Sequence, residues 1–229
     1  MKNLTILTST LLFALLLIGC KQQEIEMYDQ TPRIDFVGSG AEEIIFRDTT
    51  YVKNITELTG DVTVSIVGAA QDKPLSFSLT LIPDPEAEKP ATITLSNPYQ
   101  LPAEAYTANP PIRVTRPTEF DKAYTAFLGF EEANGSTHQF DKGRVEFERK
   151  KVSVIFRINP GVWDNRMLGL YSNGKYKFIM DTLGKVYNDI ERDDETRQLL
   201  YDAYEEYRKN NDPILDDETP RREIAFPAF

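Results

Sequence analysis

Asp61-Val-Thr-Val-Ser-Ile-Val67 decides the fold class of this chain, because apolar and small polar residues alternate strictly along it. The same alternation recurs in Leu75-Ser-Phe-Ser-Leu-Thr-Leu-Ile82. A β-strand turns successive side chains to opposite faces, so a period of two places one apolar face against a core and one Ser/Thr face toward water. Both stretches therefore predict half-buried strands of an antiparallel sheet.

Further stretches extend this series of expected strands, and turn-rich segments such as Pro83-Asp84-Pro85 separate them. They are residues 33–37, 43–46 with 50–53, 91–96, 111–116 and 123–131. In residues 143–158 the apolar positions change parity, and a bulge or turn near Arg149-Lys150-Lys151 would account for that change. Strands at short, regular intervals predict an Ig-like antiparallel β-sandwich over residues 32–158.

After Asn159-Pro-Gly161 the apolar spacing becomes helical. A first helix is expected behind Ser172 as N-cap, with Gly184 placed to end it, and its stripe consists of Tyr176, Ile179, Met180, Leu183 and Tyr187. A second helix is expected from the acidic run 193–195 to the Asn-Asn-Asp-Pro stop at 210–213, with a stripe of Leu200, Ala203, Tyr204 and Tyr207. Residues 159–229 are therefore predicted to form a helical C-terminal region with about two helices, packed on or beside the sandwich. Its tail from residue 214 either packs against a sheet or hangs free.

The N-terminus predicts a lipoprotein signal peptide over residues 1–19. Lys2 supplies the positive charge, an apolar run follows it, and the run closes on the lipobox Leu17-Ile18-Gly19-Cys20. The apolar run is shorter than the roughly 20 residues that span a bilayer. Cleavage before Cys20 would leave this cysteine as the lipid attachment residue and the polar residues 20–31 as a lipidated tether.

The charge and cysteine counts narrow the possible partners. The chain has 26 basic and 36 acidic residues, a net charge of −10, and loss of Lys2 with the leader takes −10 to −11. An acidic surface disfavours nucleic acid and anionic lipid as partners, so the acyl chains must attach the protein to the membrane. Because Cys20 is the only cysteine, its lipidation excludes disulfides, thiol catalysis and Cys-ligated metals.

No catalytic signature appears in the sequence. His138 is the only histidine and follows an Asn-Gly-Ser turn, so we expect a solvated loop residue rather than a triad member. The acidic runs fit helix starts and solvated loops, and no EF-hand calcium loop is present. We therefore predict no enzyme activity, no metal and no cofactor. A glycan-processing hydrolase stays as a distant alternative, which needs two carboxylates facing each other across a cleft.

Four aromatic residues are candidates for ligand contacts: Tyr99, Tyr106, Trp163 and Tyr171. Aromatic rings with a polar tip can stack on a sugar and hydrogen-bond to it. The competing interpretation is packing, because Trp163 follows the last expected strand and precedes the helices. At that position it would fill the junction between sheet and helices.

Three C-terminal motifs carry a resemblance: Trp163-Asp164, Leu168-Gly-Leu-Tyr-Ser172 and Lys175-Tyr-Lys-Phe-Ile179, with Tyr99-Gln-Leu-Pro102 as an upstream counterpart. With them the chain resembles a family of Bacteroidota outer-membrane lipoproteins of unknown function (DUF4843-like), often found with SusC/SusD-like nutrient-uptake systems. The resemblance implies no catalytic residue, because the family has no established activity. It implies the outer membrane, and Glu24 and Glu26 resemble the acidic signals of surface-displayed lipoproteins.

Three classes of function remain open. The first is a noncatalytic, lipid-anchored accessory or binding component of an outer-membrane uptake system, with a glycan or a peptide as ligand. It predicts an exposed groove away from the tether. The second is a structural or assembly partner of a membrane complex, which predicts an apolar surface patch. The third is the hydrolase, which predicts a pocket with shifted titratable groups.

Overall fold

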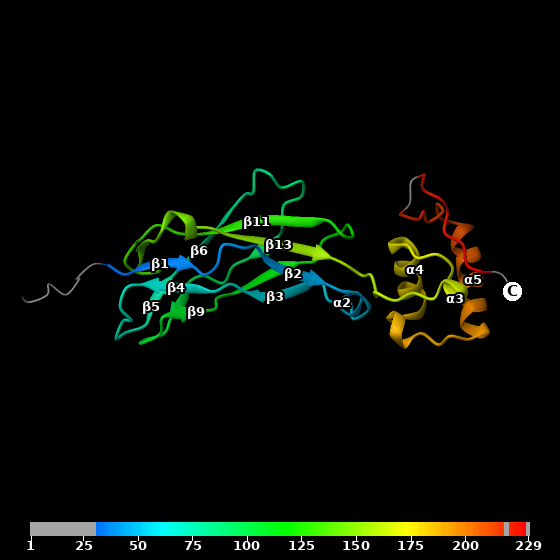
Figure 1. The fold of residues 1–229 in the computed structure, drawn as a ribbon, viewed down its shortest axis with the longest axis horizontal. Helices are drawn as coiled ribbons and strands as arrows, with labels where there is room; N and C mark the ends of the chain where they lie inside the picture. The colour runs from blue at the N-terminus through cyan, green and yellow to red at the C-terminus, as the bar shows by residue number, and fades with distance from the viewer. Residues whose placement is uncertain (1–30, 218–219, 228–229) are drawn as a thin grey trace, which may run out of the picture. The chain divides into compact units, whose positions relative to one another are not determined.

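A computed structural model describes residues 31–217 and 220–227 (Figure 1). The predicted signal peptide, the lipobox with Cys20, and the tether except its last residue lie outside the described residues. Residues 32–229 form one compact unit. The predicted fold class is confirmed, because strands fill the first part of this unit and most helices follow them.

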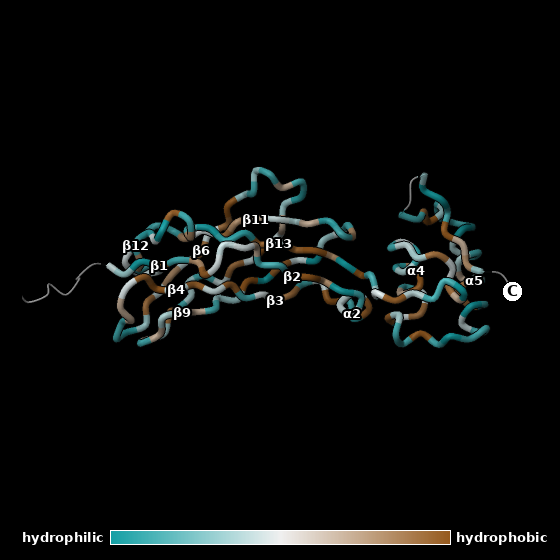
Figure 2. The backbone as a smooth tube through the Cα atoms, viewed as in Figure 1, coloured by the Kyte–Doolittle hydropathy of each residue, from teal (hydrophilic) through white to brown (hydrophobic). Residues whose placement is uncertain are grey.

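One layer of the sandwich is a four-stranded sheet in the order β2 (Glu42–Phe46), β13 (Lys150–Phe156), β11 (Ala123–Phe130) and β6 (Leu79–Ile82). Its central strand β13 is almost wholly buried. It is apolar over most of its length, and Figure 2 shows this part in brown. β2 pairs with β13 in parallel, whereas the other two pairings are antiparallel. The expectation of a purely antiparallel sandwich therefore does not hold for this edge.

The second layer consists of shorter strands in three groups. Their order is β12 (Asp141–Lys142), β1 (Arg33–Phe36), β4 (Val64–Val67) and β9 (Thr107–Ala108); then β3 (Glu57–Asp61), β10 (Pro111–Thr115) and β7 (Ile93–Thr94); then β5 (Leu75–Phe77) and β8 (Tyr99–Leu101). β12 pairs with β1 in parallel. Two residues separate β3 from β4 and also β9 from β10, so the first two groups continue into each other.

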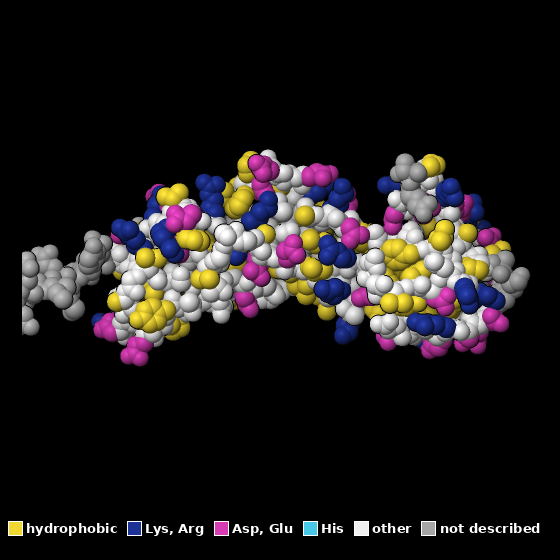
Figure 3. Space-filling view, viewed as in Figure 1, with side chains coloured by type: hydrophobic (Ala, Val, Ile, Leu, Met, Phe, Trp, Pro, Cys, Tyr) yellow, Lys and Arg dark blue, Asp and Glu magenta, His cyan; other side chains and the backbone are white. Residues whose placement is uncertain are grey.

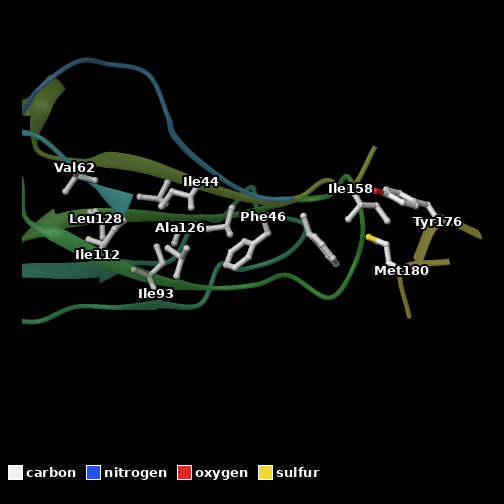
Figure 4. Close-up of a cluster of buried hydrophobic side chains, with 14 of the residues drawn as sticks. Ile44, Phe46, Val62, Ile93, Ile112, Ala126, Leu128, Ile158, Tyr176 and Met180 are labelled. Atoms are coloured by element: carbon white, nitrogen blue, oxygen red, sulfur yellow. The ribbon is translucent and has the colours of Figure 1, made fainter. Parts of the chain in front are cut away.

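The core lies between the two layers (Figure 4). The inward-facing side chains come mostly from alternate strand positions, as the period of two requires. They include Ile44, Phe46, Ile93, Ile112, Ala126 and Leu128, together with Val62 between β3 and β4. Each large side chain of this kind contributes about 1.5–3 kcal/mol through its burial. At one end of the core, Ile158 lies beside Tyr176 and Met180, so the core continues into the helical region.

The second alternating stretch does not form one strand. It breaks at Ser78, so β5 pairs with β8 while β6 pairs with β11 in the other layer. The break has a physical cause, because the backbone amide of Ser78 donates to the His138 ring and leaves the sheet ladder. The apolar face is consequently not continuous, and the side chain of Leu81 is 42% exposed.

One further strand prediction is wrong. Residues 50–53 belong to the short helix α2 (Asp48–Val52) and the turn after it, where Thr50 and the backbone of Arg47 exchange hydrogen bonds. The first part of residues 143–158 contains the 3-10 helix η1 (Val145–Phe147). Of the two explanations for the change of apolar parity, a bulge or a turn, the structure therefore confirms the turn, which is helical and lies just before β13.

The two predicted helices are confirmed together with their caps, but Tyr187 of the first predicted stripe lies beyond the end of its helix, in a 3-10 turn. α4 (Asn173–Leu183) begins behind Ser172, whose hydroxyl accepts from the Lys175 amide, and ends at Gly184 with φ 63°, a left-handed conformation that glycine adopts without strain. α5 (Asp194–Arg208) begins behind the N-cap Asp193. The turn α3 (Asn165–Leu168) and the 3-10 helix η2 (Tyr187–Asp189) complete this region.

The described part of the tail packs against the helices, not against a sheet. Ile224 donates to the carbonyl of Ile214, and Phe226 contacts Phe178 of α4 and Tyr204 of α5. A buried lysine anchors this segment: the Lys175 ammonium donates to the carbonyls of Leu168 (3.1 Å) and Ala225 (2.8 Å). Burial lowers the pKa of Lys175 to about 8.

Hydrogen bonds join α4 to the sandwich. The Tyr176 hydroxyl donates to Asp48 of α2 (2.9 Å), and the Tyr51 hydroxyl donates to Asp181 of α4 (2.6 Å). Tyr176 is fully buried, and its hydroxyl also accepts from the Tyr187 amide at 2.8 Å. Burial raises the pKa of Tyr176, so its hydroxyl keeps the proton that it donates to Asp48. The two regions therefore share side-chain hydrogen bonds as well as core.

Candidate ligand-binding pocket

A pocket of about 480 Å³ lies where the ends of β6 and β11 meet β12 and the turn before β13. Its size falls within the usual range of small-molecule sites. The apolar part of its lining comprises Ile82, Gly129, Phe130, Ala133 and Phe140, together with the His138 ring. Its polar part carries six charged side chains: Glu131, Glu132, Asp141, Lys142, Glu148 and Arg149.

Ser78 fixes the wall of the pocket that follows β11. Its amide donates to Nδ1 of His138 (3.1 Å), and its hydroxyl donates to the Thr137 carbonyl (3.0 Å). Its carbonyl accepts from the amide of Glu131 at 3.1 Å. One residue at the break between β5 and β6 therefore holds both ends of segment 131–138.

The turn inside this segment closes on Asn134. Its side-chain oxygen accepts from the amides of Ser136, Thr137 and His138, at 2.9, 2.9 and 3.0 Å. Such Asx turns arise because an asparagine side chain can replace a backbone acceptor. Gly135 takes a left-handed φ of 75°, which its missing side chain permits. The local sequence thus presents His138 toward the pocket.

Asp35 of β1 fixes the opposite wall. Its fully buried carboxylate accepts from the backbone amide (2.8 Å) and from Nε (2.7 Å) of Arg144. The preceding Gly143 lies so close that a side chain there would overlap the Asp35 carboxylate and the Ile34 carbonyl. Hydrogen bonds to a charged group are stronger than those between neutral groups, so this contact fixes the position of the segment that carries Asp141 and Lys142.

His138 is buried, which corrects the expectation of a solvated loop residue. It is 1% exposed, and its ring lies 6.1 Å from that of Phe130 and 6.2 Å from that of Phe140, centroid to centroid. Because the Ser78 amide donates to Nδ1, the neutral ring carries its proton on Nε2. Burial lowers the pKa of His138, and the nearby charge of Glu131 opposes that shift.

Acidification should therefore destabilise the fold through His138. Its folded-state pKa lies below the ordinary 6.5, so the unfolded chain binds more protons between the two values. The stabilisation is complete above about pH 6.5 and is lost as the pH falls toward the folded-state pKa. Urea denaturation should show that the free energy of unfolding decreases as the pH is lowered from 7.5 to 5. The slope should be smaller in His138→Gln, and equal slopes in both proteins would contradict this assignment.

The structure separates the four aromatic residues that the sequence singled out. Tyr99 is buried in the sandwich, where its hydroxyl donates to the Pro111 carbonyl at 3.0 Å. Tyr106 precedes β9 and is 61% exposed. Trp163 and Tyr171 come together in the helical region, edge to face with ring centroids 5.0 Å apart. None of the four lines the pocket described above.

Trp163 takes part in a packed aromatic cluster. Its Nε1 donates to the Gly169 carbonyl at 2.7 Å, and its ring contacts Tyr171, Tyr176 and Tyr187 at 5.0–5.5 Å. Tyr176 in turn bonds to Asp48 of the sandwich. The arrangement matches the packing interpretation of Trp163, since its ring and its indole N–H are both engaged.

Across residues 31–217 and 220–227, no group of three or more His, Cys, Asp or Glu side chains is arranged to hold a metal ion. Within the same ranges, no helix has the length and apolar composition needed to cross a membrane. The sequence interpretation missed the pocket, because its walls come from strands about 60 to 110 residues apart. One available signal was the run of Phe130, His138 and Phe140 around an Asn-Gly turn, a pattern more apolar than a solvated loop.

No protein-family model and no curated protein matches the chain. Among solved structures it is similar to the apo form of the Calx CBD1 domain, with 12% identity over 56% of this chain and 98% of that one and a TM-score of 0.36. It is also similar to a two-domain protein with unknown function from Bacteroides fragilis (12% identity, 56% of this chain, 46% of that one, TM-score 0.31). A protein of unknown function from Bacteroides ovatus gives 8% identity, 57% of this chain, 48% of that one and a TM-score of 0.35. The aligned part thus spans less than half of each of these two Bacteroides proteins.

Proposed function

We propose that the protein is a noncatalytic, lipid-anchored component of the cell envelope that binds a small ligand for an outer-membrane nutrient-uptake system. The observation that carries the proposal is the pocket of about 480 Å³, with an apolar floor and charged side chains at its rim. The lipobox Leu17–Cys20 supports the anchor, and the motif resemblance supports the outer membrane, surface display and the uptake context.

The chemistry of the pocket supports binding over catalysis. His138 is the histidine that lines it, and its Nδ1 already accepts a hydrogen bond from Ser78. A general base needs a free lone pair that reaches the substrate.

The pocket borders the first strand of the domain. Asp141 and Lys142, which line it, pair with Arg33 and Ile34 at the start of β1. This differs from the expectation of a groove away from the tether, since β1 is the strand that directly follows residue 31. Binding at this position would take place beside the strand through which the chain leads to its lipid anchor.

A second candidate function, an assembly partner, rests on exposed apolar side chains in the helical region. Figure 3 shows hydrophobic side chains on this region, with charged residues around them. The side chain of Val162 is 70% exposed and that of Leu170 is 67% exposed. In the sequence they are adjacent to Trp163 and Tyr171, respectively. Exposed apolar groups that lie together are typical of contact surfaces between proteins.

The proposed function predicts lipid attachment at Cys20 and recovery with a transporter. Cells fed a labelled fatty acid should label the wild-type protein and not Cys20→Ser, and the protein should fractionate with the outer membrane. Cross-linking and pull-down from native membranes should recover SusC/SusD-like proteins. Val162→Ser with Leu170→Ser should abolish recovery if assembly is the function, and should leave it intact if ligand binding is. Unlabelled wild-type protein in the soluble fraction would refute the proposal.

A further inference from the structure

We propose that the pocket recognises a cationic group carried on an apolar stem, as in a lysine side chain of a peptide or in a free arylalkyl amine. This inference rests on the proposed function of ligand binding and names the chemical class of the ligand. Two features of the pocket carry it: the aromatic floor and the uncompensated charges at the rim.

The floor is suited to an apolar stem. Phe130 stacks on Phe36 at 4.4 Å between ring centroids, and its other neighbour is the His138 ring. Phe140 is held edge-on by His138 and by Phe77. These contacts fix the rings before a ligand arrives, so its stem can be buried without ordering a mobile surface.

The rim carries an excess of negative charge. Four carboxylates and two cations line the pocket, a formal excess of two negative charges at neutral pH. In the part of the chain that the structure describes, none of these six side chains takes part in an ion pair. The nearby carboxylates Asp35 and Asp84 are instead paired, with Arg144 and Lys151. The pocket therefore gathers around its apolar floor four carboxylates that no ion pair among the described residues neutralises.

Glu131 places negative charge close to the floor. Its charge acts on the buried His138 ring, and its own backbone amide is held by Ser78. A ligand ammonium held above the apolar floor would meet this carboxylate, which favours a cation. An anionic ligand could pair with Lys142 or Arg149, but it would also face the four carboxylates. The balance of charge therefore favours a cation.

Three probes with the same phenylpropyl body separate charge from apolar contact: 3-phenylpropylamine, 3-phenylpropan-1-ol and 3-phenylpropanoate. Titration calorimetry on the full-length protein in detergent, at pH 7 and low salt, should show that the amine binds most tightly, the alcohol less tightly and the acid most weakly. One exposed ion pair strengthens binding only severalfold, so two or more carboxylates predict about tenfold tighter binding of the amine than of the alcohol. Salt should reduce this ratio.

The double variant Glu131→Gln with Glu132→Gln should bring the amine down to the affinity of the alcohol and leave the alcohol unchanged. Glu43→Gln with Glu195→Gln is the matched control, because it removes two exposed carboxylates outside the pocket. A capped Phe-Lys dipeptide that binds more tightly than the amine would identify a peptide as the natural source of the cation. A dipeptide that binds more weakly than the amine would identify a free amine. Equal affinities of amine and alcohol, tightest binding of the acid, or no binding of any probe at millimolar concentration would overturn the proposal. Lipid attachment and transporter recovery do not enter this test, so its failure leaves the proposed anchor and context standing.

Discussion

Gly143→Ala is expected to lower the free energy of unfolding by about 3 kcal/mol and to abolish binding of the amine probe. The new methyl group would overlap the buried Asp35 carboxylate and the Ile34 carbonyl, and neither belongs to a flexible side-chain end. Relief requires movement of β1 or of the segment after β12, and such overpacking usually costs about 1–3 kcal/mol or more. The movement would also break the pair of bonds from Arg144 to Asp35.

Urea denaturation followed by circular dichroism measures this effect. Gly40→Ala is the matched control, since nothing lies within 4 Å of its added methyl group and its φ is not left-handed. The control should keep both stability and amine binding. A Gly143→Ala protein as stable as Gly40→Ala would show that the Asp35 contact does not constrain this segment.

Tyr176→Ala is expected to have the largest effect on the helical region, a loss of about 3–5 kcal/mol. Tyr176 is fully buried, and its ring lies 5.5 Å from that of Trp163. Its hydroxyl links Asp48 of the sandwich to the amide of Tyr187. Truncation therefore leaves a cavity in the cluster and removes a partly buried hydrogen bond between the sandwich and the helices.

Tyr176→Phe separates these two contributions, because it keeps the ring and removes only the hydroxyl. It should cost about 1–3 kcal/mol, since the Tyr187 amide loses its acceptor in a buried setting. Tyr106→Ala, at a 61% exposed tyrosine, should change stability little. Thermal and urea unfolding compare the three proteins, and a Tyr176→Ala effect no larger than that of Tyr106→Ala would refute the packing role.

The helices were predictable because their signals are local. Ser172 and Gly184 bound α4 within a window of 13 residues, and both act on neighbouring backbone groups. Asp193 does the same for α5. The sandwich class was equally predictable, since the alternation of Val62, Val64 and Ile66 reports directly on a half-buried strand.

The pocket was not predictable, because its contacts join distant parts of the chain. Asp35 meets Arg144 across 109 positions, and Ser78 meets His138 across 60. No periodic pattern reports such pairs. The same limit explains the break at Ser78, where a long-range hydrogen bond to His138 overrides a locally continuous strand pattern.

The parallel pairings at the start of the domain have a consequence for the order of folding. More than 100 residues separate β2 from its sheet partner β13, and a similar number separates β1 from β12. Contacts between residues so far apart in the sequence slow folding, because the chain loses the entropy of closing a long loop before the contacts can stabilise it. The sandwich cannot close progressively from its N-terminus as the chain emerges. While the chain is being synthesised, β2 must remain unpaired with its sheet until β13 has emerged.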